Sequence, residues 1–90
     1  MSDMNRIMLL ARLHSHIPEK HIIIVSLLND STALVPIFYC SDAMEENLKM
    51  LTKDDMVGIT AHFDKSSSDF CRVYADKISF LASRKENSDE

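Results

Sequence analysis

The 90-residue chain contains one glycine, two prolines and no tryptophan, and it has no long uninterrupted apolar run. One glycine excludes a glycine-rich phosphate loop. No run approaches the roughly 20 apolar residues that a membrane-spanning helix needs. The first residues lack a basic segment followed by an apolar stretch and a cleavage site, so we expect no secretory signal and no membrane partner. These absences predict a cytoplasmic protein.

An excess of basic residues is also missing, because the formal net charge is −4. Proteins that bind nucleic acids gain affinity by placing Lys and Arg against phosphates. A local basic stripe can exist on an acidic chain, so the charge does not exclude such a partner. It predicts that any such binding is weak and sensitive to salt. The 46% of hydrophobic residues is typical of one globular domain.

Side chains that carry chemistry are few. Cys40 and Cys71 both fall in expected strands, and we expect them to be reduced core residues. His14, His16 and His21 suggest a metal, but no Cys, Asp or Glu stands beside them at a zinc-ligand spacing. No Ser or Cys lies in a nucleophile motif. The sequence therefore predicts a protein that is not an enzyme and that holds no metal or cofactor.

Five strand-like segments and one helix follow each other along the chain. Apolar runs, most of them with several Val, Ile, Tyr or Phe residues, cover residues 5–13, 21–28, 34–40, 56–63 and 70–81. Asp42 is expected to cap a helix after the third run, with Glu45 completing a capping box. Met44, Leu48 and Leu51 then form one apolar helix face.

A strand set interrupted once, by a short helix after the third strand, is the wiring of a five-stranded OB barrel. We therefore predict an all-β protein with one short helix, built as an OB-fold domain over residues 1–82. Residues 64–69 form a polar loop, and residues 14–20 form another around Pro18. The charged residues 83–90 are expected to form a disordered polar tail.

Three separated blocks follow known sequence patterns. Residues 51–60, Leu-Thr-Lys-Asp-Asp-Met-Val-Gly-Ile-Thr, look like Leu-x-Lys-Gly-Asp-x-Val-x-Val-Glu. Residues 73–81, Val-Tyr-Ala-Asp-Lys-Ile-Ser-Phe-Leu, are similar to Val-Val-Ala-Asp-x-Val-x-Phe-Leu, and residues 5–13, Asn-Arg-Ile-Met-Leu-Leu-Ala-Arg-Leu, are similar to Asn-Arg-Val-x-Leu-x-Gly-Arg-Leu. With these blocks as middle, closing and opening patterns, the chain resembles the bacterial and phage-type single-stranded DNA-binding protein family. Its short connection at residues 29–31 also resembles the primosomal replication protein N branch of that family.

The resemblance implies an OB fold that binds single-stranded DNA without sequence preference in replication, repair or recombination. It also implies a homo-oligomer, either a dimer or a tetramer. The apolar run at residues 22–25, with Val35, Ile37 and Tyr39, is more apolar strand surface than a small barrel needs, and we expect a partner chain to cover some of it. The alignment places Leu34 and Cys40 where the family often has stacking aromatics.

Single-strand binding needs rings that stack on bases and basic groups along the backbone path. Phe38 is the best remaining stacker on its strand, unless it belongs to the core. Arg72 and Tyr74 share one strand face and could clamp a nucleotide, or simply form a solvated surface. Residues that could complete a broken basic groove, or be ordinary surface groups, are Arg6, Arg12, His62 and Lys65.

Two functions remain open at this point. The first is sequence-nonspecific binding of single-stranded nucleic acid, with DNA preferred to RNA. The second is an OB-fold protein-interaction module, a replication accessory that has lost the DNA site. The acidic balance, the aliphatic residue and thiol at Leu34 and Cys40, and the shortened connection favour the second.

Overall fold

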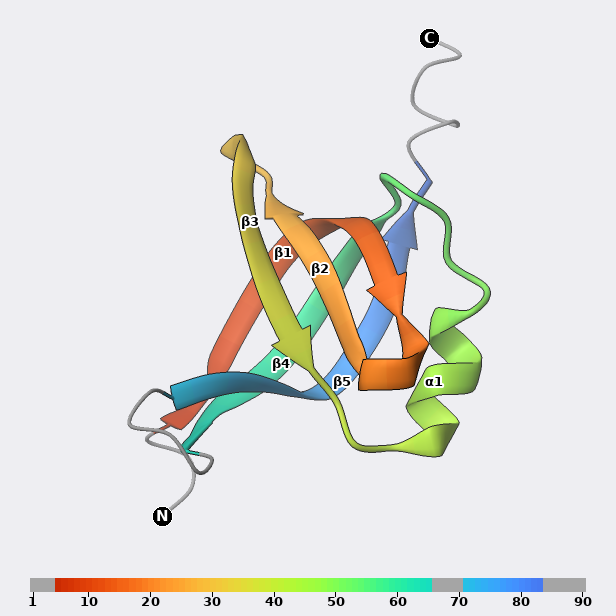
Figure 1. The fold of residues 1–90 in the computed structure, drawn as a ribbon. Coiled ribbons are helices and arrows are strands. Elements are labelled where there is room, and N and C mark those ends of the chain that lie inside the picture. The colour runs from red at the N-terminus through yellow and green to blue at the C-terminus, as the bar shows by residue number, and fades with distance from the viewer. Residues whose placement is uncertain (1–4, 66–70, 84–90) are drawn as a thin grey trace, which may run out of the picture.

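The computed structural model describes residues 5–65 and 71–83, which form a five-stranded closed sheet with one α-helix (Figure 1). The predicted loop at 64–69 and the predicted tail at 83–90 lie largely outside the described residues. The elements in chain order are β1 (Ile7–Ile17), the 3-10 helix η2 (Pro18–Lys20), β2 (Ile22–Leu27), β3 (Asp30–Phe38), α1 (Asp42–Leu48), β4 (Met56–Lys65) and β5 (Cys71–Ala82).

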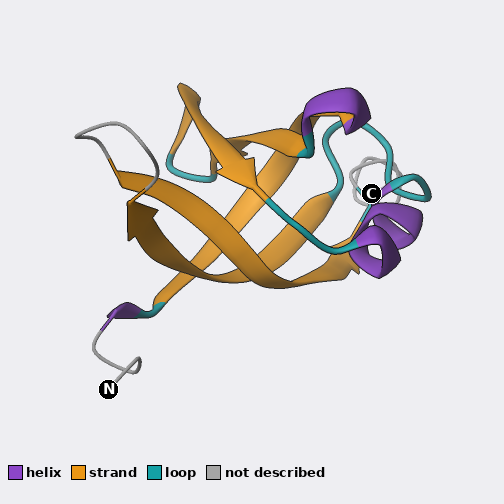
Figure 2. Ribbon diagram, turned by 60° about the horizontal axis from the view of Figure 1, so that its bottom comes forward, coloured by secondary structure: helices purple, strands orange, loops and turns teal. Residues whose placement is uncertain are grey.

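The strands follow the order β1-β2-β3-β5-β4, and β4 returns to β1, so the sheet has no free edge. All neighbours are antiparallel except β3 and β5, which run parallel and join at one pair, Phe38 opposite Tyr74. The predicted mostly-β class with a single short helix after the third strand is confirmed. Figure 2 shows η2 and α1 at the same end of the sheet.

Two strand boundaries differ from the prediction. Residues 14–17, expected as loop, continue β1, because His16 and Ile17 pair with Ile23 and Ile22 after a register shift between Leu13 and Ser15. A bulge of this kind bends a strand without ending it, and the polar histidines concealed that continuity in the sequence. β3 begins at Asp30 and ends at Phe38, so the predicted turn at 29–31 is shorter than expected.

The N-cap of the helix lies one residue earlier than predicted. Ser41, not Asp42, is the N-cap, and its Oγ accepts a hydrogen bond from the Met44 backbone N–H at 3.2 Å. The apolar helix face is confirmed for Leu48, which is buried, and for Met44, which packs against the core. Leu51 also packs against the core, but it lies beyond the helix, which ends at Leu48. These three side chains line a small cavity together with Ile78 and Phe80 of β5. The helix is therefore fixed against β5 at one end of the sheet.

The core fills the inside of the closed sheet. Residues that alternate along each strand are the buried ones, as a two-residue side-chain period requires. The fully enclosed apolar side chains include Ile23, Val25, Ile37, Tyr39, Val57 and Ile59. Ile23, Val25, Ile37 and Tyr39 belong to this core, so they are not available to a partner chain. Of the apolar set from which we expected a partner to cover a part, only Ile22, Ile24 and Val35 are half-buried.

Both cysteines depart from the predicted core role. Cys40 follows the end of β3 and Cys71 is the first residue of β5, and both are exposed free thiols. Val73 and Ala75 do lie on the inner side of β5, as predicted, and pack in or against the core. The alternation fails at Cys71 because this residue is at the strand end, where no opposing layer covers it.

A tight turn before β4 ties that strand to β1. Asp54 has a left-handed φ of 76°, its N–H donates to the Leu13 carbonyl at 2.7 Å, and the Leu13 N–H donates to the Asp55 carbonyl at 2.9 Å. The Asp55 side chain is 5% exposed. Its carboxylate accepts hydrogen bonds from the Thr52 N–H at 2.9 Å and from the Thr52 hydroxyl at 3.1 Å. This carboxylate holds the turn closed.

Asp55→Ala is expected to lower the free energy of unfolding by about 1–3 kcal/mol, because it leaves the Thr52 N–H without its acceptor in a part-buried site. Asp54→Asn is the matched control. Asn tolerates the left-handed backbone as Asp does, and a change there should stay within about 0.5 kcal/mol. Urea unfolding followed by far-UV circular dichroism measures both. Equal losses in the two variants would contradict the role given to Asp55.

Candidate nucleic-acid interface

Four of the seven predicted site residues come together on the outer side of the sheet. Phe38 ends β3, His62 lies in β4, and Arg72 and Tyr74 lie in β5. We call Phe38, His62, Arg72 and Tyr74 the ring cluster. Its members are exposed or half-buried, in keeping with an outward direction. The predicted alternation in β5 is confirmed here, because Arg72 and Asp76 are exposed while Ala75 is buried.

The rings of the cluster lie in contact with one another. The Phe38 and Tyr74 ring centroids are 5.6 Å apart with an interplanar angle of 36°, and the His62 ring lies 6.1 Å from Tyr74 at 20°. The Arg72 guanidinium carbon lies 4.7 Å from the Phe38 ring centroid, within cation–π range. The cluster thus presents three adjacent rings, those of Phe38, Tyr74 and His62, with the positive charge of Arg72 over the Phe38 ring.

The register of the strands explains this gathering. Tyr74 is opposite Phe38 in the parallel pairing and opposite His62 in the antiparallel pairing. One residue of β5 therefore joins side chains that are 24 positions apart in the sequence. The same pairings place Asp64 opposite Arg72.

A hollow of about 390 Å³ lies beside Tyr74. It is lined on one side by His62, Asp64 and Asp76. His62 Nδ1 lies 3.0 Å from a carboxylate oxygen of Asp76, so protonation of this imidazole would make an ion pair there. The carboxylates of Asp64 and Asp76 would repel a phosphate bound at the ring cluster. The sequence did not point to these two residues. Their effect depends on cross-strand register, which the sequence does not display.

The other three predicted basic residues have different positions. Arg6 is exposed and lines a second hollow with His62 and Asp76, so it lies at the margin of the ring cluster. Arg12 lies opposite Met56, at the other end of β4, and its Nη1 donates to the Asp54 carbonyl at 3.0 Å. It supports the turn and takes no part in the cluster.

Lys65 was expected in a loop, but it is the last residue of β4, where its backbone is opposite Cys71. Leu34 and Cys40 are exposed, as residues of a binding face would be. Neither offers a ring.

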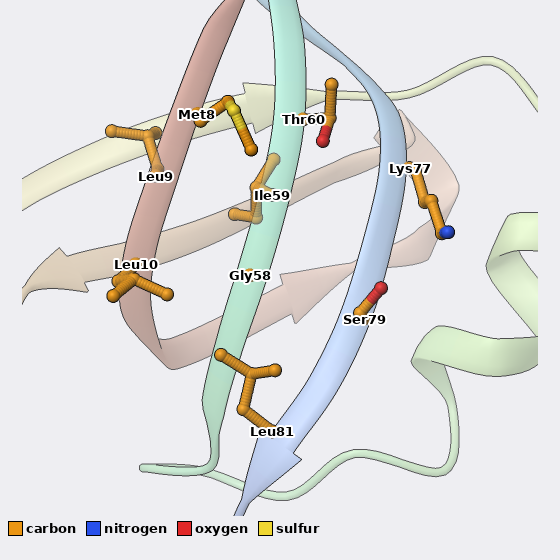
Figure 3. A pocket seen from close by; sticks show the side chains of 9 residues that line it. All are labelled: Met8, Leu9, Leu10, Gly58, Ile59, Thr60, Lys77, Ser79 and Leu81. Atoms are coloured by element: carbon orange, nitrogen blue, oxygen red, sulfur yellow. The ribbon is translucent and has the colours of Figure 1, made fainter.

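A second surface feature lies on β1, β4 and β5. Met8 and Leu10 of β1 and Leu81 of β5 are 77%, 57% and 48% exposed. They surround Gly58, where the missing side chain leaves an apolar groove of about 460 Å³ (Figure 3). We call this hollow the apolar groove after its residues Met8, Leu10, Gly58 and Leu81; Thr60, Lys77 and Ser79 also line it. Sequence periodicity did not reveal this groove, because Met8 and Leu10 have the pattern of ordinary hydrophobic residues in a strand.

No family model matches the chain, and no curated protein matches it. Among the described residues, none of the helices has the length and apolar character to cross a membrane.

Proposed function

We propose that the protein is an OB-fold single-stranded DNA-binding protein that acts without sequence preference in DNA replication, repair or recombination. The observation that carries this proposal is the ring cluster. Stacking on aromatic side chains is worth about 1–3 kcal/mol per base and tolerates any sequence. Phe38 and Tyr74 supply such rings, and Arg72 adds the cation that a nucleotide backbone requires.

Two backbone features support the family resemblance. Asp54 has its left-handed φ of 76° at the position where the family pattern has Gly, the residue that adopts this conformation most easily. Asn5, in the opening pattern, bonds Phe63 of β4 from both ends of its amide. Its Nδ2 donates to the Phe63 carbonyl at 2.7 Å and its Oδ1 accepts from the Phe63 N–H at 3.0 Å. The left-handed backbone at position 54 therefore accounts for Gly in the family pattern, and the two hydrogen bonds to Phe63 account for Asn at position 5.

A second candidate is an OB-fold interaction module, a replication accessory without a DNA site. The acidic residues Asp64 and Asp76 beside the ring cluster and the exposed apolar groove favour it. On this alternative the ring cluster is a packed surface and proteins are the partners. The cytoplasmic location stays a prediction under both candidates.

Binding to single strands should be measurable, weak and steeply dependent on salt. Few cations are available, so we expect a slope of log affinity against log salt of about −0.7 for each phosphate contacted, with no more than two or three contacts. Fluorescence anisotropy of a labelled oligo-dT at about 50 mM and about 200 mM salt measures this. Undetectable binding at tens of micromolar protein and low salt would favour the interaction module instead.

The ring cluster should control that affinity residue by residue. Tyr74→Ala is expected to cost about 1–3 kcal/mol of binding free energy through the lost stacking surface. Arg72→Ala should weaken binding to all sequences alike and reduce the salt slope by less than about one unit.

Lys53→Ala is the matched charge control for Arg72. Lys53 precedes β4, whereas His62 of the ring cluster lies toward the strand's other end, six residues or about 20 Å beyond Met56. Lys53→Ala should therefore leave the anisotropy titration unchanged. If Arg72→Ala and Tyr74→Ala are silent while the oligonucleotide still binds, the binding face lies elsewhere on the sheet.

We propose further that the chain forms a homo-oligomer, either a dimer or a tetramer built from two dimers, through the apolar groove. Contiguous exposed apolar surface is uncommon on monomeric proteins and often marks an interface. Met8 and Leu10 flank the floor at Gly58, where a Cβ would meet Leu81 and Leu10 only at ordinary contact distances of 3.5 and 3.9 Å. A two-fold related copy could therefore insert its own Met8 over the groove of its partner.

Met8→Lys should shift the protein toward monomer, because a charge would be buried at the interface. Met50→Lys is the control, since Met50 is 81% exposed against 77% for Met8 and lies after α1, outside the groove. Sedimentation velocity over a range of protein concentrations reports the mass. A monomer at every concentration rejects the proposal, and so does equal dissociation in the two variants.

A further inference from the structure

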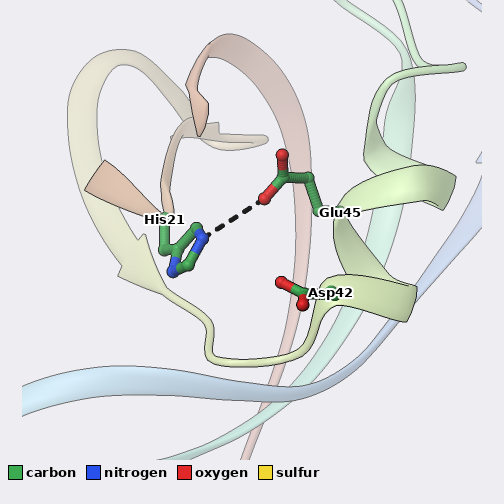
Figure 4. A group of neighbouring side chains, drawn as sticks. All are labelled: His21, Asp42 and Glu45. Carbon is green, nitrogen blue, oxygen red and sulfur yellow. Dashed lines mark ion pairs between the residues drawn. The ribbon is translucent and has the colours of Figure 1, made fainter. Parts of the chain in front are cut away.

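A histidine and two carboxylates that are distant in the sequence meet at the helical end of the sheet. His21 lies between η2 and β2, while Asp42 and Glu45 lie on the first turns of α1 (Figure 4). Their potential ligand atoms all lie within 4.8 Å of one another. Sequence spacing had indicated no acidic partner for the histidines, and the fold supplies two.

We propose that His21, Asp42 and Glu45 bind a divalent transition-metal cation of the zinc class. A tetrahedral zinc ion with ligand bonds of about 2.0–2.1 Å needs ligand atoms about 3.3–3.4 Å apart. His21 Nε2 and Glu45 Oε1 are 3.3 Å apart, so this edge of a tetrahedron already has its length. Asp42 is exposed, and since all the ligand atoms already lie within 4.8 Å of one another, a change of its side-chain rotamer would bring its carboxylate to complete the set.

The backbone holds the imidazole in place without help from a metal. His21 has a left-handed φ of 57°, its N–H donates to the Pro18 carbonyl at 3.1 Å, and its carbonyl accepts from the Tyr39 N–H at 3.0 Å. Its ring lies 5.2 Å from the Tyr39 ring. The two carboxylates are three residues apart on α1, a spacing that puts side chains on one helix face. All three ligands are therefore presented from fixed segments.

The nearby charges leave the site negative. Lys49 Nζ lies 4.0 Å from Glu45 Oε2, the oxygen that faces away from His21, so it neutralises only part of that carboxylate. A neutral imidazole with two carboxylates suits zinc, cobalt, nickel or manganese better than calcium, which takes six to eight oxygen ligands. Three protein ligands leave one tetrahedral position for water.

The neighbouring histidine is already engaged elsewhere. His16 Nε2 lies 2.7 Å from the Tyr39 hydroxyl, and burial lowers the pKa of His16 below its usual value, with smaller effects from surrounding charges. His16 is therefore held as a hydrogen-bond partner of Tyr39, whose ring lies against His21. A bound cation would join the β1–β2 connection to α1, and binding to the folded state alone would stabilise the fold.

The test is a zinc titration of chelator-treated protein by isothermal calorimetry, with thermal unfolding as the second readout. The exposed thiols Cys40 and Cys71 can bind zinc themselves, so the titration uses the double variant Cys40→Ser, Cys71→Ser. We expect one ion per chain and a raised melting temperature. Oligonucleotide is absent, so the result is independent of the proposed nucleic-acid function.

His21→Ala and Asp42→Asn should each weaken zinc binding by about tenfold or more, because each removes one ligand. His14→Ala is the matched control, since His14 is an exposed histidine of β1 whose ring nitrogen lies 3.3 Å from the Ser15 hydroxyl. It should bind zinc as the parent does. No binding by the parent below about 1 mM zinc overturns the proposal. Equal affinity of parent and His21→Ala, or dependence on His14, overturns it as well.

Discussion

The single parallel pairing of β3 with β5, at Phe38 opposite Tyr74, closes the sheet, and the candidate interface depends on it. The other four strand contacts are antiparallel and longer. Without this closure, β3 would be an open edge with unpaired backbone groups. With it, a ring from the end of β3 comes against a ring from β5. The step that completes the core thus assembles the outer ring cluster as well.

Much of the fold follows from residue pattern, and the exceptions have physical causes. Alternation in β5 predicted that Val73 and Ala75 face inward, and it failed at Cys71, where the strand begins without a covering layer. The apolar helix face of Met44 and Leu48 was predictable because helical spacing is local, whereas Leu51, predicted on the same face, lies beyond the end of the helix. The bulge after Leu13 was not, since it arises from cross-strand register.

The candidate site divides along the same line. Phe38, Arg72 and Tyr74 could be chosen from the sequence because a stacker and a cation have identifiable residue types. Their closeness to His62 depends on two registers, which only the structure supplies. Arg12 shows the converse. It has the right charge on the right strand, but register puts it beside the Asp54 turn, where its guanidinium bonds a carbonyl.

Phe38, the last residue of β3, and Tyr39, which follows it, connect the two proposed sites. Phe38 points outward to Tyr74 and Arg72, while Tyr39 is 2% exposed and points inward, where its hydroxyl meets His16 and its ring meets His21. Burial raises the pKa of the Tyr39 hydroxyl, as desolvation of a phenolate requires, so it stays a neutral hydrogen-bonding group. Because Tyr39 is packed in the core at close-packed density, the backbone at this point is held in place by the inner packing. The same backbone fixes Phe38 on the outer side, so the position of the ring cluster depends on the core packing of its neighbour.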